Sequence, residues 1–211
     1  MKLAKPIVFV VCLVPAARIG WGIFCAATGC TAPPYLAQHL GVNPIREAEI
    51  QTGLWTLRFL AIALAVTPAR RITHWNVLGK YRRMMGLFTF FYARVHLSLW
   101  FVDWWFDWKA MGDELVKHKF IFIGMLTFLI LVPLAITSTN GWIRRLGKTW
   151  TKIHRLVYVA AITATIHYLW GLSSKEGPTP TFPMLYLATF ALLLGYRVYD
   201  NWRKHQRMTR A

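Results

Sequence analysis

Six long apolar stretches, separated by short polar segments, constrain this chain more than any other feature. They lie at 7–27, 54–68, 84–105, 119–137, 153–171 and 182–200. A helix that crosses a bilayer needs about 20 mostly apolar residues, and the short second stretch reaches that length if its helix begins near Ile50. With 56% hydrophobic residues, the chain has too little polar surface for a soluble domain. We therefore predict an all-α integral membrane protein with six transmembrane helices.

Basic residues are concentrated in alternate connections between these stretches. Seventeen of the 25 Lys and Arg residues lie before residue 7 or within 70–83, 144–155 and 197–210, whereas the other connections hold five basic residues and seven of the eight acidic ones. Connections rich in Lys and Arg stay in the cytoplasm, so both termini are predicted to be cytoplasmic. Because the net charge of +17 is divided among short clusters, it does not indicate nucleic-acid binding.

Three histidines lie within the apolar stretches: His96, His154 and His167. Polar groups are costly in hydrocarbon, so such residues are functional candidates. A rise of about 1.5 Å per residue places His96 roughly 18 Å and His167 roughly 22 Å from the basic side, with His154 close to that side. Two neutral imidazoles at one level on different helices can supply both axial ligands of a b-type haem. The pattern therefore predicts a helix bundle that binds haem through His96 and His167.

Other roles for the histidines remain open at this point. Each could instead form a hydrogen bond to a neighbouring helix. His154 and His167 are thirteen residues apart, about 140° around an ideal helix, so they share a face only if the helix is distorted. The spacing is compatible with two stacked haems or with a single ligand from this pair.

Three arginines also fall within the apolar stretches. Arg58 and Arg94 lie toward the outer half of the second and third stretches, where a guanidinium group could pair with haem propionates. Snorkelling of these side chains to the membrane interface is the alternative. Arg18, in the first stretch, has no acidic partner in any apolar stretch.

The cysteines show no spacing typical of covalent haem attachment, since no C-x-x-C-H is present. Cys25 and Cys30 fall near the predicted outer surface, where a disulfide is chemically permitted. We interpret them as two unpaired apolar thiols.

Six sequence blocks, in order and spacing, resemble one family. They are Leu40–Pro44 (LGVNP), Thr67–Arg70 (TPAR), Tyr81–Leu87 (YRRMMGL), Ala93–Leu97 (ARVHL), Leu146–Tyr158 (LGKTWTKIHRLVY) and His167–Trp170 (HYLW). Together they resemble the haem-binding membrane subunits of periplasmic methionine sulfoxide reductase systems, which belong to the ferric-reductase-like transmembrane group. The resemblance covers nearly the whole chain and implies one domain over residues 1–211.

The resemblance implies a b-type cytochrome in the bacterial inner membrane. It would take electrons from membrane quinol or a flavin and pass them to a periplasmic molybdopterin-containing reductase, so that catalysis takes place on the partner chain. The haem ligands implied are His96, His154 and His167. The resemblance also implies an FMN near the cytoplasmic face, with Arg82 and Arg83 as candidates for its phosphate. Both arginines are equally typical of cytoplasmic anchors.

The sequence departs from the wider ferric-reductase group at one place. That group carries a second histidine about four turns below the first on the third helix, where this chain has Arg82 and Arg83. This difference favours one haem between the third and fifth helices. No G-x-G-x-x-G motif follows a predicted strand, and about ten residues follow the sixth stretch, so we expect no nicotinamide-binding domain.

Two other functions are compatible with the residues. One is a stand-alone ferric reductase or another quinol-linked cytochrome b subunit. The other is a small proton-coupled transporter or assembly scaffold that uses the histidines without haem, and this protein would be colourless when purified.

Overall fold

The computed structural model describes residues 4–30, 40, 42–173 and 181–209, and every regular element in these ranges is a helix. The helices are α1 (Ala4–Thr28), α2 (Pro44–Thr73), the 3₁₀ helix η1 (Asn76–Lys80), α3 (Arg82–Asp103), α4 (Trp108–Lys117), α5 (Lys119–Ile136), α6 (Asn140–Leu146), α7 (Lys148–His154), α8 (Leu156–Ser173) and α9 (Thr181–Thr209). Among them α1, α2, α3 and α5 are long and apolar enough to cross a membrane. The chain is therefore an all-helical membrane protein with at least four candidate spans.

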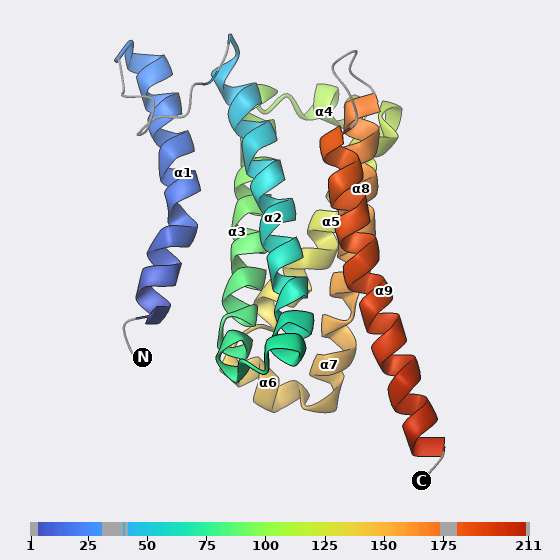
Figure 1. Ribbon diagram of the computed structural model, residues 1–211. Coiled ribbons are helices and arrows are strands. Elements are labelled where there is room, and N and C mark those ends of the chain that lie inside the picture. Colours follow the sequence, from blue (N-terminus) through green and yellow to red (C-terminus); the bar gives the residue numbers. More distant parts are fainter. Residues whose placement is uncertain (1–3, 31–39, 41, 174–180, 210–211) are drawn as a thin grey trace.

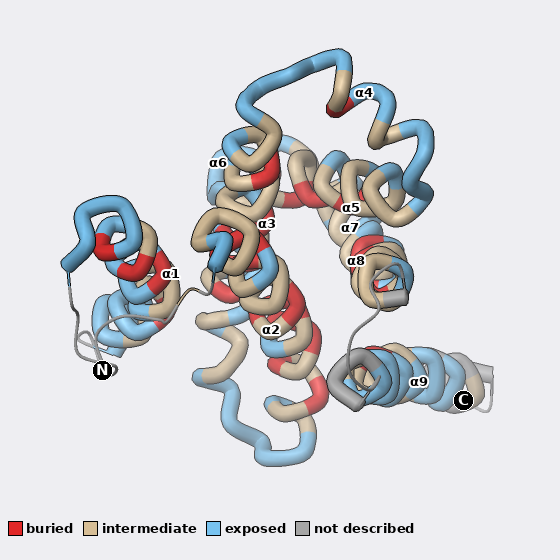
Figure 2. Tube along the Cα trace, turned by 90° about the horizontal axis from the view of Figure 1, so that it is seen from above, coloured by how far each residue is buried: buried red, intermediate tan, exposed pale blue. Residues whose placement is uncertain are grey.

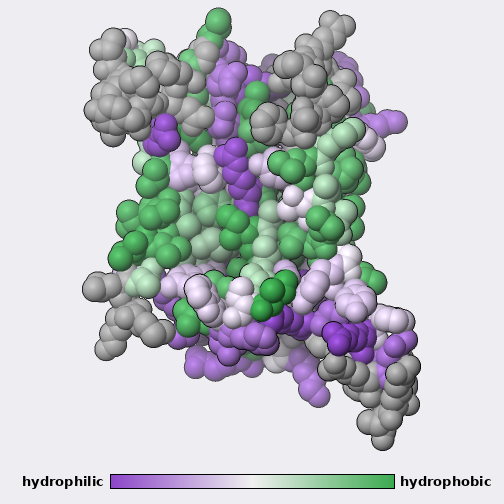
Figure 3. Space-filling view, in the orientation of Figure 1, coloured by the Kyte–Doolittle hydropathy of each residue, from purple (hydrophilic) through white to green (hydrophobic). Residues whose placement is uncertain are grey.

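The long helices run along one common axis. In Figure 1, α1, α2, α3, α5, α8 and α9 alternate in direction, and the two chain ends lie at the end of the bundle that holds α6 and α7. We call this the lower end, and the opposite end, where α4 lies, the upper end. On the face drawn in Figure 3, an apolar band crosses the middle of the molecule, and hydrophilic side chains lie beneath this band. Down the axis, α1 and α9 stand at the margins of the bundle (Figure 2).

Two helical hairpins form the centre of the bundle. Helix α2 packs most extensively on α3, and α5 on α8. Leu57, Leu60 and Leu64 of α2 meet Ala161 and Ala164 of α8 in one buried cluster. A second cluster joins α3, α5 and α8 through Ala93, Leu131, Leu134 and Ala160. The small alanine side chains allow the two hairpins to approach closely.

Helix α2 is much longer than the predicted 54–68. It begins at Pro44, where the Asn43 side chain accepts a hydrogen bond from the Arg46 amide at 3.0 Å. This is a standard N-cap, and proline is favoured in the first turn that follows. The polar residues between Pro44 and Gly53 concealed this start from a hydropathy argument.

Helix α2 also continues through Pro68 to Thr73. Proline has no N–H, so the Leu64 carbonyl four residues earlier loses its usual donor. Arg197 of α9 replaces it, since Nη2 donates to that carbonyl at 3.2 Å and Nη1 donates to the Tyr158 hydroxyl of α8 at 2.6 Å. A tertiary contact therefore satisfies the backbone that proline would otherwise leave unpaired.

The predicted span 153–171 is divided in the structure. Helix α7 ends at His154 and α8 begins at Leu156, with a tight turn in which the Arg155 amide donates to the Lys152 carbonyl at 3.2 Å. His154 therefore does not belong to the helix that carries His167. The 140° separation calculated for one ideal helix does not apply to this pair.

The predicted span 84–105 ends two residues early, at Asp103. Trp105 and Phe106 adopt positive φ angles of 49° and 57°, which a continuing right-handed helix excludes. The short helix α4 follows and was not among the predicted elements. The predicted ranges 7–27, 119–137 and 182–200 coincide with helices α1, α5 and α9 apart from their ends, and of these three helices α1 and α5 are candidate spans.

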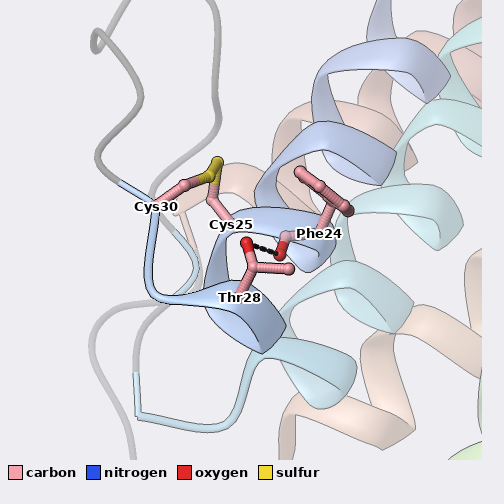
Figure 4. The surroundings of a disulfide bond; sticks show 4 residues. All are labelled: Phe24, Cys25, Thr28 and Cys30. Carbon is pink, nitrogen blue, oxygen red and sulfur yellow. Dashed lines mark hydrogen bonds between the residues drawn. A yellow bond between two sulfur atoms is a disulfide. The ribbon is translucent and has the colours of Figure 1, made fainter.

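Cys25 and Cys30 form a disulfide, so the interpretation of two free thiols is wrong. Helix α1 ends at Thr28, and Gly29 adopts a φ of 70° that turns the chain back on the helix. This turn brings the Cα atom of Cys30 to 4.6 Å from that of Cys25, within bonding range. Figure 4 shows the bond beside the last turn of α1, where the Thr28 hydroxyl donates to the Phe24 carbonyl at 2.8 Å.

A buried tyrosine attaches α1 to the rest of the bundle. The Tyr92 hydroxyl donates to the Cys12 carbonyl at 2.8 Å and accepts from the Ala16 amide at 3.1 Å. In a regular helix the Ala16 amide would donate directly to the Cys12 carbonyl. Here the Tyr92 hydroxyl lies between these two groups, next to Pro15. The Tyr92 ring stacks on Phe59 of α2 with centres 5.1 Å apart.

We expect Tyr92→Phe to lower the free energy of unfolding by about 1 kcal/mol, because two interhelical hydrogen bonds are lost while the ring packing stays. Thermal unfolding in detergent, followed by circular dichroism, measures the change. Tyr199→Phe is the matched control, since Tyr199 is exposed. Equal melting temperatures for the two variants would contradict this role of Tyr92.

Candidate functional site

His96 of α3 and His167 of α8 meet in the upper half of the bundle. Their ring centres are 6.1 Å apart, with 75° between the ring planes. Each Nδ1 lies close to a backbone carbonyl of the other helix in its hairpin: His96 at 2.7 Å from the Glu49 oxygen, and His167 at 2.6 Å from the Phe120 oxygen. The structure thus brings together the two histidines that were predicted to share one level.

A glycine makes room for each imidazole. A Cβ atom on Gly53 would lie 3.2 Å from the His96 ring, and a Cβ atom on Gly124 would lie 2.6 Å from the His167 ring. A larger residue at Gly124 would force the His167 ring to move, and a larger residue at Gly53 would press against the His96 ring. The sequence therefore uses glycine, at a cost in helix propensity, where a side chain has to lie against a helix backbone.

The hydrogen bonds determine which nitrogen of each ring is available. A carbonyl only accepts, so each Nδ1 carries the proton and each Nε2 keeps a free lone pair. This is the tautomer that a histidine ligand to a metal needs, and a carbonyl partner is a usual way to hold it. Two imidazoles at opposite axial positions of one metal have ring centres about 6 Å apart, because each metal–nitrogen bond is about 2 Å long. The ring separation therefore fits haem binding, in which His96 and His167 would each supply one ligand to the iron.

The two halves of this site are built alike. In each hairpin the carbonyl and the imidazole are 47 residues apart, and the glycine follows the carbonyl residue by one helical turn. Every member of the second half lies 71 positions after its counterpart: Glu49 and Phe120, Gly53 and Gly124, His96 and His167. The same offset pairs Arg83 with His154. We call this arrangement the hairpin repeat.

His154 lies in a separate cavity of about 260 Å³ toward the lower end. Its ring stacks on Trp150 with centres 3.9 Å apart, and its Nε2 is 3.5 Å from the Ser138 hydroxyl. Trp150 is held in turn, since its Nε1 donates to the Thr137 carbonyl at 2.9 Å. The apolar part of the cavity is formed by Leu60, Leu64, Phe90, Leu131, Leu134 and Val157.

Arg82 and Arg83 line the same cavity as His154. Both side chains are exposed at its edge, and Arg83 donates to the Asn140 side chain at 2.6 Å. The cavity therefore combines an apolar interior with two cationic groups at one side.

The structure does not bring Arg58 and Arg94 together with the imidazole pair. Arg58 Nε donates to the Tyr186 hydroxyl at 3.2 Å, and its guanidinium group lies over the Trp55 ring. Arg94 is exposed on α3. Pairing of either arginine with haem propionates stays a prediction.

The sequence argument missed three residues that shape these sites: Gly53, Gly124 and Trp150. A glycine inside an apolar helix signals a close approach of another group, but many membrane helices contain such glycines. Only the common 71-residue offset of Gly53–His96 and Gly124–His167 distinguishes these two. Trp150 lies before the predicted span, and the sequence argument used it only as part of the Leu146–Tyr158 block.

Comparison with known proteins identifies the family. Residues 52–165 match the family described as ferric reductase like transmembrane component. The protein-methionine-sulfoxide reductase heme-binding subunit MsrQ of Xanthomonas campestris pv. campestris (strain B100) is 42% identical over 202 residues, covering 94% of this chain and 87% of that protein. The chain belongs to the MsrQ family.

Other relatives carry the same name. MsrQ of Herminiimonas arsenicoxydans is 41% identical over 210 residues, which is 98% of this chain and 89% of the relative. MsrQ of Xanthomonas oryzae pv. oryzae (strain MAFF 311018) is 40% identical over 203 residues, which is 95% of this chain and 87% of the relative. These matches extend over nearly the full length of this chain and of each relative.

Proposed function

We propose that this chain is the haem-binding membrane subunit of a methionine sulfoxide reductase system. It would take electrons from membrane quinol or a flavin and pass them to a separate periplasmic molybdopterin-containing reductase. The observation that carries the proposal is the imidazole pair, with ring centres 6.1 Å apart and both Nδ1 atoms held by carbonyls. The names of the MsrQ relatives supply the reductase system.

The protein's own residues would hold and insulate the cofactor. His96 and His167 would hold the haem by binding its iron, and bound haem would supply reversible one-electron chemistry. The carbonyls of Glu49 and Phe120 would keep both rings in the ligating tautomer. Oxidation of a quinol releases two electrons and two protons, and reduction of a sulfoxide to a thioether consumes two of each with release of water. The net reaction therefore balances without a further reductant.

We propose six spans with both termini in the cytoplasm of a bacterium, in one domain over 1–211. Two features support this orientation. The lower end carries the basic segments 70–83 and 144–155, which are retained in the cytoplasm. The upper end carries the Cys25–Cys30 disulfide, a bond that persists in oxidising compartments such as the periplasm. The imidazole pair would then lie in the half of the membrane nearer the reductase.

We propose that the lower cavity takes a second redox group, for which FMN is our candidate. A largely apolar space beside two guanidinium groups suits an aromatic ring system with a phosphate, which Arg82 and Arg83 would bind. In the hairpin repeat Arg83 stands at the position related to His154, so the second hairpin contributes a histidine to this cavity and the first hairpin an arginine. A second haem at this level would have His154 as its one histidine ligand among the residues that line the cavity.

The visible spectrum of the purified protein tests the main proposal. We expect a Soret band, a pyridine haemochrome typical of b-type haem, and oxidation of the dithionite-reduced haem by the co-expressed reductase when methionine sulfoxide is supplied. A colourless protein from cells fed with haem precursor would contradict haem binding. Oxidation by ferric chelates at the same rate without the reductase would instead identify a ferric reductase.

A further inference from the structure

An arginine lies halfway along a helix that crosses the membrane. Arg58 is the fifteenth of the 30 residues of α2, so each helix end is about 21 Å away along the axis. Its side chain is only half-buried, and a hydrophilic patch over α2 interrupts the apolar band of Figure 3. Half of the hydrocarbon layer is about 15 Å thick, which exceeds the length of an arginine side chain. Arg58 therefore cannot reach the phosphates of either lipid layer by snorkelling.

Two aromatic side chains already hold the guanidinium group. Nε donates to the Tyr186 hydroxyl of α9 at 3.2 Å, and the central carbon lies 4.5 Å from the centre of the Trp55 ring. These contacts leave the four N–H donors of Nη1 and Nη2 without an acceptor in the described parts of the chain. A charged group at this depth is costly unless it is paired. A ligand that brings a hydrogen-bond acceptor into the bilayer core would reduce that cost.

Arg58 points away from the imidazole pair. Gly53 marks the face of α2 that contacts His96. Arg58 follows Gly53 by five residues, which is about 140° around the helix and about 7.5 Å along it. The described residues place α1 and α9 on either side of this face of α2, with no packing between α1 and α9. The guanidinium group of Arg58 thus lies on the side of α2 that faces lipid, between α1 and α9.

We propose that Arg58, Tyr186 and Trp55 bind the ring of a membrane quinone, an inference that rests on the proposed electron-transfer function. A quinone dissolves in the bilayer core, where its ring oxygens can accept hydrogen bonds from the Nη groups. Its flat ring can stack beside the Trp55 indole. A quinone in this position lies one helix away from His96, about 10 Å. The site therefore gives the electron donor a defined place beside the haem.

Quinone binding to the haem-loaded, full-length protein in quinone-free nanodiscs tests this site. A short-chain benzoquinone is titrated, and the quinone bound per polypeptide is measured after extraction. We expect Arg58→Leu to raise the dissociation constant at least about tenfold, because a hydrogen bond to a charged donor is lost, and Tyr186→Phe to raise it less. Arg18→Leu is the matched control, since Arg18 is an exposed arginine within α1. The haem spectrum should stay unchanged in all three variants.

Three results for Arg58→Leu would overturn the site. The first is a quinone affinity equal to that of the wild type with no other change. The second is loss of haem together with loss of quinone, and the third is loss of bound phospholipid while the quinone affinity stays the same. The second would identify Arg58 as a propionate partner, and the third would identify a lipid site. If Arg58→Leu does not fold, the quinone dissociation constants of Arg58→Lys and Tyr186→Phe are compared with those of the wild type and Arg18→Leu instead. Reduction of the wild-type haem by quinol is measured separately. If quinone binds but quinol does not reduce the haem, quinol is not the electron donor, whereas the quinone site itself stands.

Discussion

Replacement of His96 or His167 by alanine is expected to leave less than about a tenth of the wild-type Soret absorbance per polypeptide. Each variant removes one of the two proposed haem ligands, and even residues that only orient a metal ligand change affinity by about 10–100-fold. The remaining imidazole cannot compensate, because its own carbonyl partner holds it in place on its hairpin. Absorbance spectra and pyridine haemochrome stoichiometry of the detergent-purified proteins measure the effect.

His118→Ala is the control for this pair. His118 lies between α4 and α5 and contacts Glu114 at 3.3 Å, away from both sites. We expect it to retain full haem. His154→Ala should retain the haem of the imidazole pair, since His154 lines the separate lower cavity. Full haem content in His96→Ala or His167→Ala would refute the assignment of the ligands.

Alanine at Gly124 is expected to reduce haem affinity almost as much as the loss of a ligand, about 10–100-fold. The added methyl group would lie 2.6 Å from the His167 ring, a distance at which the ring has to move and lose its bond to the Phe120 carbonyl. Gly53→Ala should have a smaller effect, because the corresponding distance to His96 is 3.2 Å. Transfer of haem from each variant to a competing haem-binding protein gives the relative affinities.

The control for the glycine variants is Gly20→Ala, whose new Cβ atom would have no neighbour within 4 Å. Alanine favours helices over glycine by about 1 kcal/mol, so none of the three variants should weaken its own helix. Any loss of haem then reports on the position of the ring. Equal haem affinities for Gly124→Ala and Gly20→Ala would show that the close contact has no functional effect.

The long helices and the imidazole pair could be predicted from sequence because both depend on periodic, local properties. An apolar stretch of about 20 residues determines a span, and the rise per residue determines the depth of His96 and His167. The structure places those two rings in contact, as their predicted depths require. That they bind iron stays a prediction.

The features that sequence reasoning missed depend on contacts between distant residues. Helix α2 passes through Pro68 because Arg197, from another helix, supplies the missing donor. Helices α7 and α8 separate at Arg155, where neither glycine nor proline marks a break. Cys30 reaches Cys25 because Gly29 reverses the chain, a conformation that composition alone does not specify.

The hairpin repeat bears on the ancestry of the site. A single hairpin with its carbonyl, glycine and imidazole would offer one histidine ligand, and two copies facing each other would supply the two proposed histidine ligands of one haem. A duplicated and fused helical hairpin would therefore have gained a symmetric cofactor site in one step. After such a fusion each copy could diverge independently, and the difference between Arg83 and His154 at the other end of the hairpins would be an example of such divergence.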